Sequence, residues 1–177
     1  MGRMTEAVKH LIIINVLFFI APQLMPDLGL QNMFALYFPE NPKFGFWQFL
    51  THMFMHGGFT HLLFNMFALV VFGSALERVW GEKRFLIYYM VCGIGSFFLY
   101  EFTVGLNIYS QIDSFDPGVD MGWVLGASGS VFGLLLGFGM LFPNTKLMLL
   151  FPPIPIKAKY FVMGYGAIEL MTAFQNN

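Results

Sequence analysis

Five long apolar runs restrict this sequence to a narrow range of folds. A helix that crosses a bilayer needs about 20 mostly apolar residues. Five segments approach or reach that length, the last two being short. They cover approximately residues 8–25, 59–76, 85–102, 126–142 and 160–174. The pattern predicts an all-α, polytopic bundle of transmembrane helices that forms a single domain over residues 1–177.

The composition independently excludes an ordinary soluble domain. Apolar residues make up 57% of the chain and charged residues 11%, whereas soluble domains carry about 25% charged residues. The interior of a soluble fold of this size is too small to bury 23 phenylalanines. The net charge of −1 gives no indication of nucleic-acid binding, and the single cysteine, Cys92, excludes a disulfide within the chain.

The first apolar run resembles a signal peptide, because basic residues precede its apolar centre. No small-residue cleavage site follows it, and further membrane-length runs come later in the chain. We therefore expect the run to remain attached as the first membrane helix.

The basic residues indicate the orientation in the membrane, because cytoplasmic connections are enriched in Lys and Arg. Eight of the nine basic residues lie on one side of the predicted bundle, and only Lys43 lies on the other. The side of Lys43 also includes the connection that carries Asp113, Asp116 and Asp120. The other eight are Arg3, Lys9, Arg78, Lys83, Arg84, Lys146, Lys157 and Lys159. This distribution predicts a multi-pass protein with a cytoplasmic N-terminus, and we expect the membrane to be a bacterial inner membrane.

The first outer connection, residues 26–58, is rich in Phe, Trp and Met but is interrupted by Pro39, Pro42 and Gly45. These breaks prevent it from spanning the bilayer. It fits two interpretations equally well: a segment half-submerged in the membrane interface, where aromatic residues are favoured, or a lid over the helices.

Polar side chains inside the apolar runs are the candidate functional residues, because such groups are costly in a bilayer. His61 and Asn65 are four residues apart and share one face of the second helix. They lie in its outer half, at a depth similar to that of Ser128 in the fourth helix. The alternative is a patch of interhelical hydrogen bonds. Glu169 in the fifth helix has no assigned role.

The stretch GASGSVFG, residues 126–133, combines two signals. Gly129, Gly133 and Gly137 are spaced four apart, which is typical of close helix packing. The G-x-S-x-G hydrolase pattern fails because Ser130 occupies its last glycine position. A helix that begins near Gly126 nevertheless leaves its first N–H groups unpaired, where they can hold an oxyanion beside Ser128.

Together these residues resemble the rhomboid family of intramembrane serine proteases. The resemblance covers nearly the whole chain. It rests on FWQFLTHMFMHGGFTHLLFN at residues 46–65, ALERVWG after the second helix, and GASG at residues 126–129. It implies cleavage of transmembrane segments of other membrane proteins within the lipid bilayer, with no metal or other cofactor.

The resemblance also implies a role for each matched residue. Ser128 is the nucleophile, while His61, Asn65 and the Ser128 N–H form the oxyanion hole. Supporting positions are His56, Gly126, Gly129 and Phe132. Two positions depart from the family pattern: Gln48 stands where many relatives carry Arg, and Phe132 where many carry Tyr.

The largest departure concerns the general base, which in this family is a His on a sixth helix. The printed sequence ends at Asn177, after the fifth predicted helix, and contains no such His. We therefore expect a domain incomplete at its C-terminus and a polypeptide without protease activity, whose full-length parent is a protease. The sequence downstream of Asn177 would decide this point.

Two other function classes remain open. A non-catalytic rhomboid-like protein would bind membrane clients without cutting them, and the missing base favours it. A metal site or transporter would use His52, His56 and His61, of which the first two are four residues apart. The substrate, its cleavage site and the oligomeric state are not encoded in any recognisable pattern.

Overall fold

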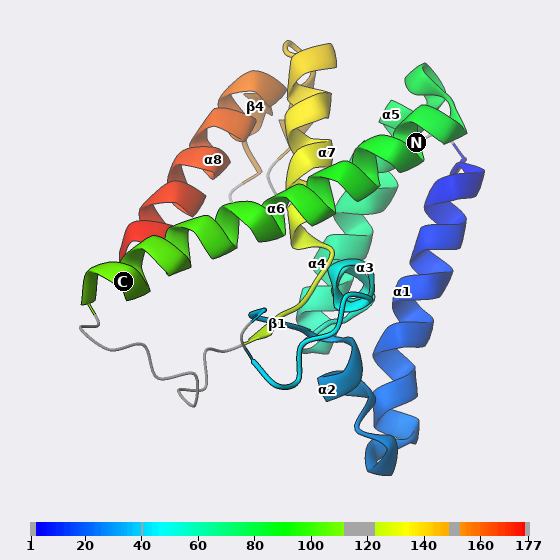
Figure 1. The fold of residues 1–177 in the computed structure, drawn as a ribbon. Helices are drawn as coiled ribbons and strands as arrows, with labels where there is room; N and C mark the ends of the chain where they lie inside the picture. The colour runs from blue at the N-terminus through cyan, green and yellow to red at the C-terminus, as the bar shows by residue number, and fades with distance from the viewer. Residues whose placement is uncertain (1–2, 40, 112–122, 149–152, 176–177) are drawn as a thin grey trace.

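The computed structural model describes residues 3–39, 41–111, 123–148 and 153–175 (Figure 1). Helices form most of this part of the chain. The main ones are α1 (Glu6–Leu24), α4 (Phe59–Ala68), α5 (Ser74–Trp80), α6 (Glu82–Gln111), α7 (Ser128–Leu141) and α8 (Ala158–Gln175). The predicted loop carboxylates Asp113, Asp116 and Asp120 lie outside the described residues.

A helix covers each of the five predicted apolar segments. The second is continuous from Phe59 to Trp80, because the π-helical stretch η3 (Leu69–Gly73) joins α4 to α5. Among the described residues, two helices, Glu6–Leu24 and Phe59–Trp80, are long and apolar enough to cross a membrane. Ser128–Leu141 is apolar but shorter.

The structure also contains short strands that the all-α prediction did not include. Leu36–Tyr37 (β1) pairs antiparallel with Trp123–Val124 (β2), and Lys146–Met148 (β3) pairs antiparallel with Pro155–Lys157 (β4). Both pairs lie in connections between helices, where local backbone pairing satisfies N–H and C=O groups that no helix provides for. The β1–β2 pair joins the first outer connection to the segment that leads into α7.

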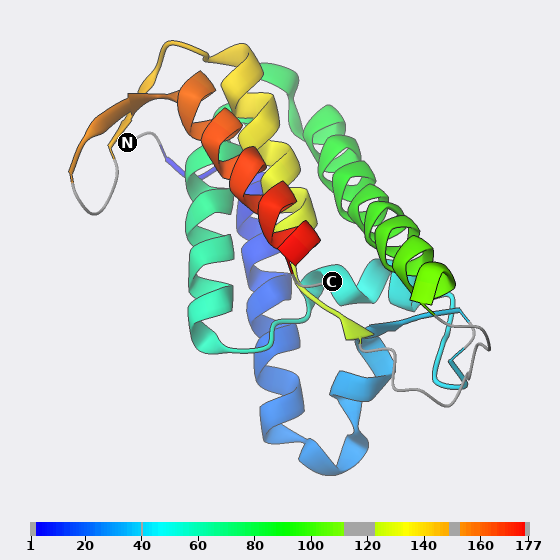
Figure 2. The ribbon, with the colours of Figure 1, turned by 90° about the vertical axis from the view of Figure 1, so that its left-hand side faces the viewer.

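The first outer connection is folded over the outer end of the bundle (Figure 2). It contains η1 (Pro26–Leu28), α2 (Leu30–Phe34), β1, α3 (Gln48–Thr51) and η2 (His52–Phe54). Phe46 and Trp47 are 81% and 53% exposed, whereas Met53, Phe54 and Met55 are buried. The connection therefore packs on the helices with one side and presents aromatic residues on the other, which is compatible with both predicted interpretations.

Helix α7 packs against α4, α5, α6 and α8. Its contact with α6 confirms the predicted glycine face. A Cβ added at Gly129 would collide with Ser96, and one at Gly133 would collide with Cys92. A Cβ at Gly137 would lie 3.0 Å from the Trp80 ring and 3.2 Å from the Tyr88 hydroxyl. The two helices thus approach as closely as they do only because these positions lack side chains.

Replacing Gly133 with Ala should destabilise the bundle by about 1–3 kcal/mol, because the new methyl group has no room beside Cys92. Gly95→Ala in α6 is the matched control, since no atom lies within 4 Å of its added Cβ, and alanine favours helix. Unfolding of both variants in mixed micelles measures the difference. Equal stabilities of the two variants would contradict the packing role.

Glu77, at the end of the second helix, caps the first. It is 7% exposed, and its carboxylate accepts hydrogen bonds from the backbone N–H groups of Ala7 and Val8, each at 3.1 Å. It also accepts one from the Thr5 hydroxyl. N–H groups in the first turn of a helix have no partner within that helix. Glu77 supplies this partner for α1 from about 70 residues away in sequence.

Glu77→Gln should lower the free energy of unfolding by about 2 kcal/mol, because an amide cannot accept from all three donors and loses the charge that strengthens these bonds. Glu6→Gln is the control, because Glu6 pairs only with Lys9 on the exposed surface and should change stability by less than about 0.5 kcal/mol. Thermal unfolding of both variants provides the measurement, and similar midpoints would refute the capping role.

Candidate active site

Ser128 is the first residue of α7, and its side chain is exposed. The chain reaches it through Gly126, whose φ of +121° is rarely adopted by residues with side chains. The Gly126 N–H donates a 2.9 Å hydrogen bond to the carbonyl of His52 in the outer connection. The conformation of Gly126 and its backbone hydrogen bond to His52 therefore determine the position of Ser128.

His61 and Ser128 both lie close to Gly126. The point where a Cβ of residue 126 would stand lies 2.9 Å from His61 Nε2 and 3.6 Å from Ser128 Oγ. Any side chain at position 126 would collide with the His61 ring, which explains the need for glycine in a second way. The structure thus brings together two of the polar residues that the sequence singled out, although they are 67 residues apart.

Asn65 lies one turn after His61 on the same helix and is 6% exposed. Its amide nitrogen is buried and has no hydrogen-bond partner among the described residues. Buried donors are usually paired, because leaving one unpaired costs about 1–3 kcal/mol. A buried, unpaired donor next to His61 is expected in a site that binds a negatively charged oxygen.

His56 packs against His61, with ring centroids 5.1 Å apart. Its Nδ1 donates to the carbonyl of Phe54 at 3.2 Å, which leaves the buried Nε2 without a partner among the described residues. Burial, together with the neighbouring His61, lowers the pKa of His56 to about 4. The imidazole is therefore neutral at physiological pH and supports the His61 ring without adding charge.

His52 and Gln48 hold the outer connection, a structural role that the sequence did not predict for either residue. His52 Nδ1 donates to the Gln48 carbonyl at 2.8 Å, and burial lowers the pKa of His52. The fully buried Gln48 amide donates to the carbonyl of Lys43 at 2.9 Å and accepts from the Tyr37 N–H at 3.3 Å. The spacing of four residues was the only available signal, and it does not specify these partners.

No general base contacts Ser128 in the described part of the chain, where its hydroxyl has no hydrogen-bond partner. Of the four histidines, His10 lies near the start of α1, at the end of the bundle opposite to the start of α7 (Figure 1). His52 and His56 are directed toward carbonyls of the outer connection. Among the described residues, the arrangement places the Ser128 hydroxyl, His61 and the Asn65 amide near one another, without a base in contact with the serine.

The Rhomboid domain family matches residues 43–176. The chain belongs to the rhomboid family. Rhomboid proteins are integral membrane proteins and generally serine proteases that act within the membrane, which agrees with the apolar helices of this chain. The matched range contains every residue assigned to the site, from His56 to Phe132.

Three relatives illustrate the similarity of this rhomboid protein to known ones. It is 36% identical to YdcA of Bacillus subtilis over 103 residues, which is 57% of this chain and 45% of YdcA. It is 35% identical to the rhomboid protease GluP of B. subtilis over 50% of this chain and 14% of GluP. It is 38% identical to mitochondrial rhomboid protein 1 of Saccharomyces cerevisiae over 58% of this chain and 27% of that protein. The chain therefore covers less than half of each relative.

Other residues singled out from the sequence follow Ser128 on α7. Gly129 provides the close contact with Ser96, and Ser130 is buried and donates to the Tyr89 carbonyl at 2.8 Å. The Phe132 ring faces α8, 5.8 Å from the ring of Tyr165. The side chain of Glu169 lies outside the described residues.

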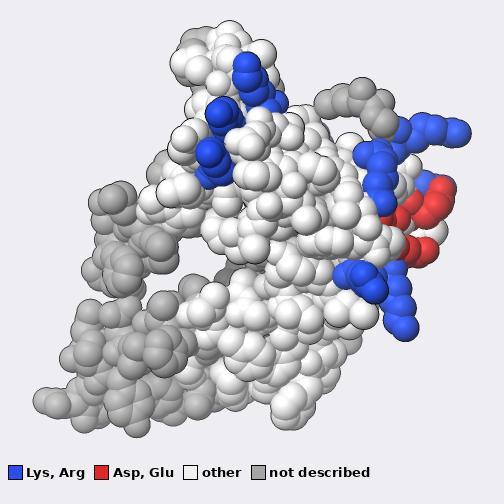
Figure 3. All heavy atoms as spheres, turned by 90° about the horizontal axis from the view of Figure 1, so that it is seen from above, with Lys and Arg blue, Asp and Glu red and all other residues white. Residues whose placement is uncertain are grey.

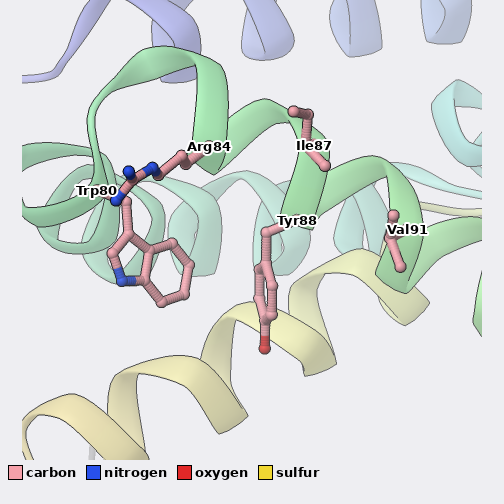
Figure 4. A pocket seen from close by; sticks show the side chains of 5 residues that line it. All are labelled: Trp80, Arg84, Ile87, Tyr88 and Val91. Carbon is pink, nitrogen blue, oxygen red and sulfur yellow. The ribbon is translucent and has the colours of Figure 1, made fainter.

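A pocket of about 470 Å³ opens elsewhere on the rhomboid bundle, near the α5–α6 turn. It is lined by Trp80, Arg84, Ile87, Tyr88 and Val91 (Figure 4). It contains no residue of the Ser128 site, and its walls are mostly apolar. Within the described residues, no three His, Cys, Asp or Glu side chains are grouped so that they could hold a metal ion.

The low pKa of His56 predicts how stability depends on pH. Its pKa is about 4 in the fold and about 6.5 in an unfolded chain. Between these values the unfolded state binds more protons, so stability should fall by up to ~3 kcal/mol as the pH drops from 6.5 to 4. His56→Gln should show a flatter dependence between pH 4 and 8 in unfolding experiments, and identical profiles would contradict the assignment.

Proposed function

We propose that this rhomboid chain carries the nucleophile and oxyanion hole of an intramembrane serine endopeptidase that acts on transmembrane segments of other proteins. The observation that carries the proposal is that His61 Nε2 and Ser128 Oγ lie 2.9 Å and 3.6 Å from the same point, the one where a Cβ of Gly126 would stand. The unpaired amide nitrogen of Asn65 supports it. The relatives named as rhomboid proteases agree with this function.

In the proposed reaction, Ser128 Oγ attacks the carbonyl carbon of a peptide bond, and the carbonyl oxygen becomes negatively charged. The Ser128 N–H at the start of α7, a neutral His61 with its proton on Nε2, and the Asn65 amide donate hydrogen bonds to that oxygen. The amine then leaves with a proton and an acyl-enzyme remains, which water hydrolyses. The Oγ proton must first pass to a base.

The described residues do not provide the base that would accept the Oγ proton. A serine hydroxyl without a neighbouring base is a weak nucleophile, and an oxyanion hole alone sustains only residual catalysis. We therefore propose that a polypeptide of these 177 residues binds a peptide carbonyl at this site but cleaves it poorly.

The membrane arrangement completes the proposal. α1, the continuous helix from α4 to α5, α6, α7 and α8 each cross the bilayer, and Ser128 opens to the side opposite to the N-terminus. Basic side chains gather at the end of the bundle that carries α5 and β4, as the view from that end shows (Figure 3). Because cytoplasmic ends are enriched in Lys and Arg, we place this end in the cytoplasm, in a bacterial inner membrane.

A fluorophosphonate probe tests the nucleophile, and added imidazole tests the missing base. The 177-residue protein in detergent should label slowly, and imidazole should accelerate the labelling because it accepts the serine proton in place of a side chain. Ser128→Ala should abolish labelling, whereas Ser130→Ala should retain it. Asn65→Ala should slow the imidazole-dependent reaction by about 100-fold, the effect of losing one oxyanion donor.

Two results would contradict the proposal, each at a different step. Rapid labelling of Ser128 without imidazole would show that a base is already present. Labelling that stays absent with imidazole, in protein whose unfolding transition is intact, would exclude Ser128 as the nucleophile.

The absence of a base beside Ser128 among the described residues also favours a second function, in which the protein holds membrane clients without cutting them. Crosslinking to a transmembrane peptide distinguishes the two. A non-catalytic binder should retain the peptide equally well in wild type and Ser128→Ala, with imidazole present or absent. A protease site should yield cleaved peptide in wild type when imidazole is added.

A further inference from the structure

The hairpin of β3 and β4 connects α7 to α8 at the end of the bundle opposite to Ser128 (Figures 1 and 2). Its base is closed by two backbone hydrogen bonds: the Ala158 N–H donates to Thr145 at 2.8 Å and the Lys159 N–H to Pro143 at 3.2 Å. Leu147 packs against the hydrophobic core. The hairpin is therefore attached to both helices at its base and projects from them.

The charges on this hairpin are arranged unfavourably for the isolated protein. Lys146 stands directly opposite Lys157 in the antiparallel register, and like charges in such a pair are destabilising. Lys157 and Lys159 also flank the start of α8, where the helix dipole disfavours positive charge. The first turn of α8 carries no acidic residue to compensate.

No carboxylate offsets these lysines locally. The sequence contains no Asp or Glu from residue 128 to residue 159, and among the described residues the ion pair is Lys9 with Glu6, on α1. Figure 3 shows the basic side chains of this face in two groups, with acidic side chains beside one group only. The lysines of the hairpin thus form a surface of positive charge without neighbouring carboxylates in the described part of the chain.

Apolar and aromatic side chains accompany the lysines. Met148, the last residue of β3, and Ile154, just before β4, are 65% and 51% exposed. Tyr160 is 58% exposed, and the Lys159 ammonium lies 5.0 Å from the centre of its ring. A surface that combines exposed aliphatic groups, a tyrosine and several lysines is typical of the boundary between acyl chains and headgroups.

We propose that the β3–β4 hairpin binds the headgroups of anionic phospholipids, with Lys146, Lys157 and Lys159 contacting phosphate. Charge complementarity selects an anionic partner, and the exposed Met148 and Ile154 select a lipid over an acidic peptide, because lipid acyl chains cover them. Phospholipids also surround the protein, since rhomboid proteins are embedded in the bilayer. Headgroup binding offsets the repulsion between Lys146 and Lys157 and so steadies the connection between α7 and α8.

Titration with dioctanoyl phosphatidylglycerol, in a neutral detergent, tests this binding without reference to catalysis. Affinity is measured by native mass spectrometry, with dioctanoyl phosphatidylcholine as the lipid control. Removing both charges with Lys146→Gln/Lys157→Gln should weaken phosphatidylglycerol binding by about 25-fold, or about 5-fold per lysine. Lys83→Gln/Arg84→Gln removes the same charge from the α5–α6 turn and should weaken it by less than about 5-fold.

A charge reversal separates binding from folding. Lys146→Glu should form a cross-strand ion pair with Lys157, so its unfolding temperature without lipid should be equal to or above that of wild type. Its affinity for phosphatidylglycerol should nevertheless fall by about 25-fold. Unchanged affinity in this variant, or equal losses in the two Gln double variants, would overturn the proposal. Hexaglutamate that binds as tightly as phosphatidylglycerol would overturn the choice of lipid.

Discussion

The contact between α6 and α7 is the constraint on which the rest of the structure depends. Membrane helices gain little from hydrophobic association with each other, because lipid is as apolar as their side chains. Close packing has to supply the attraction instead. Gly129, Gly133 and Gly137 let α7 lie directly against Ser96, Cys92 and Tyr88. Since Ser128 immediately precedes this glycine face, the same contact that holds the bundle together sets the depth of the serine.

The outer connection completes the site through its backbone more than through its side chains. The His52 carbonyl holds the Gly126 N–H, while Gln48 and Thr51 bind carbonyls of the same connection. His52 and His56 have lowered pKa values because they are buried, so they pack as neutral rings. A connection that contains many polar backbone groups can therefore lie on apolar helices without leaving charges buried beneath it.

The two ends of the molecule differ in chemistry. The end that carries Ser128 has exposed aromatic residues such as Phe46 and Trp47, whereas the Lys and Arg side chains of the described residues, apart from Lys43, gather at the other end. At this second end Glu77 joins the start of α1 to the end of the second helix, and the β3–β4 hairpin joins α7 to α8. Hydrogen bonds between distant segments thus close the basic end, and helix packing organises the end that carries Ser128.

The sequence by itself determined the helices and the candidate residues. Apolar runs, the four-residue spacing of His61 and Asn65, and the glycine face of residues 129–137 are local patterns, and local patterns follow from helix geometry. The family match also agrees with the resemblance drawn from residues 46–65 and 126–129. The five crossings and the catalytic roles remain proposals, because length and composition alone qualify two helices as spans.

Only the tertiary structure decided which groups meet. The approach of His61 and Ser128 to Gly126, the hydrogen bond from Gly126 to His52, and the capping of α1 by Glu77 each join residues that are about 67 to 74 positions apart. No periodic pattern encodes such pairs, because they depend on how whole helices pack. The short strands were missed for the same reason, since two or three residues pair only after the helices have brought them side by side.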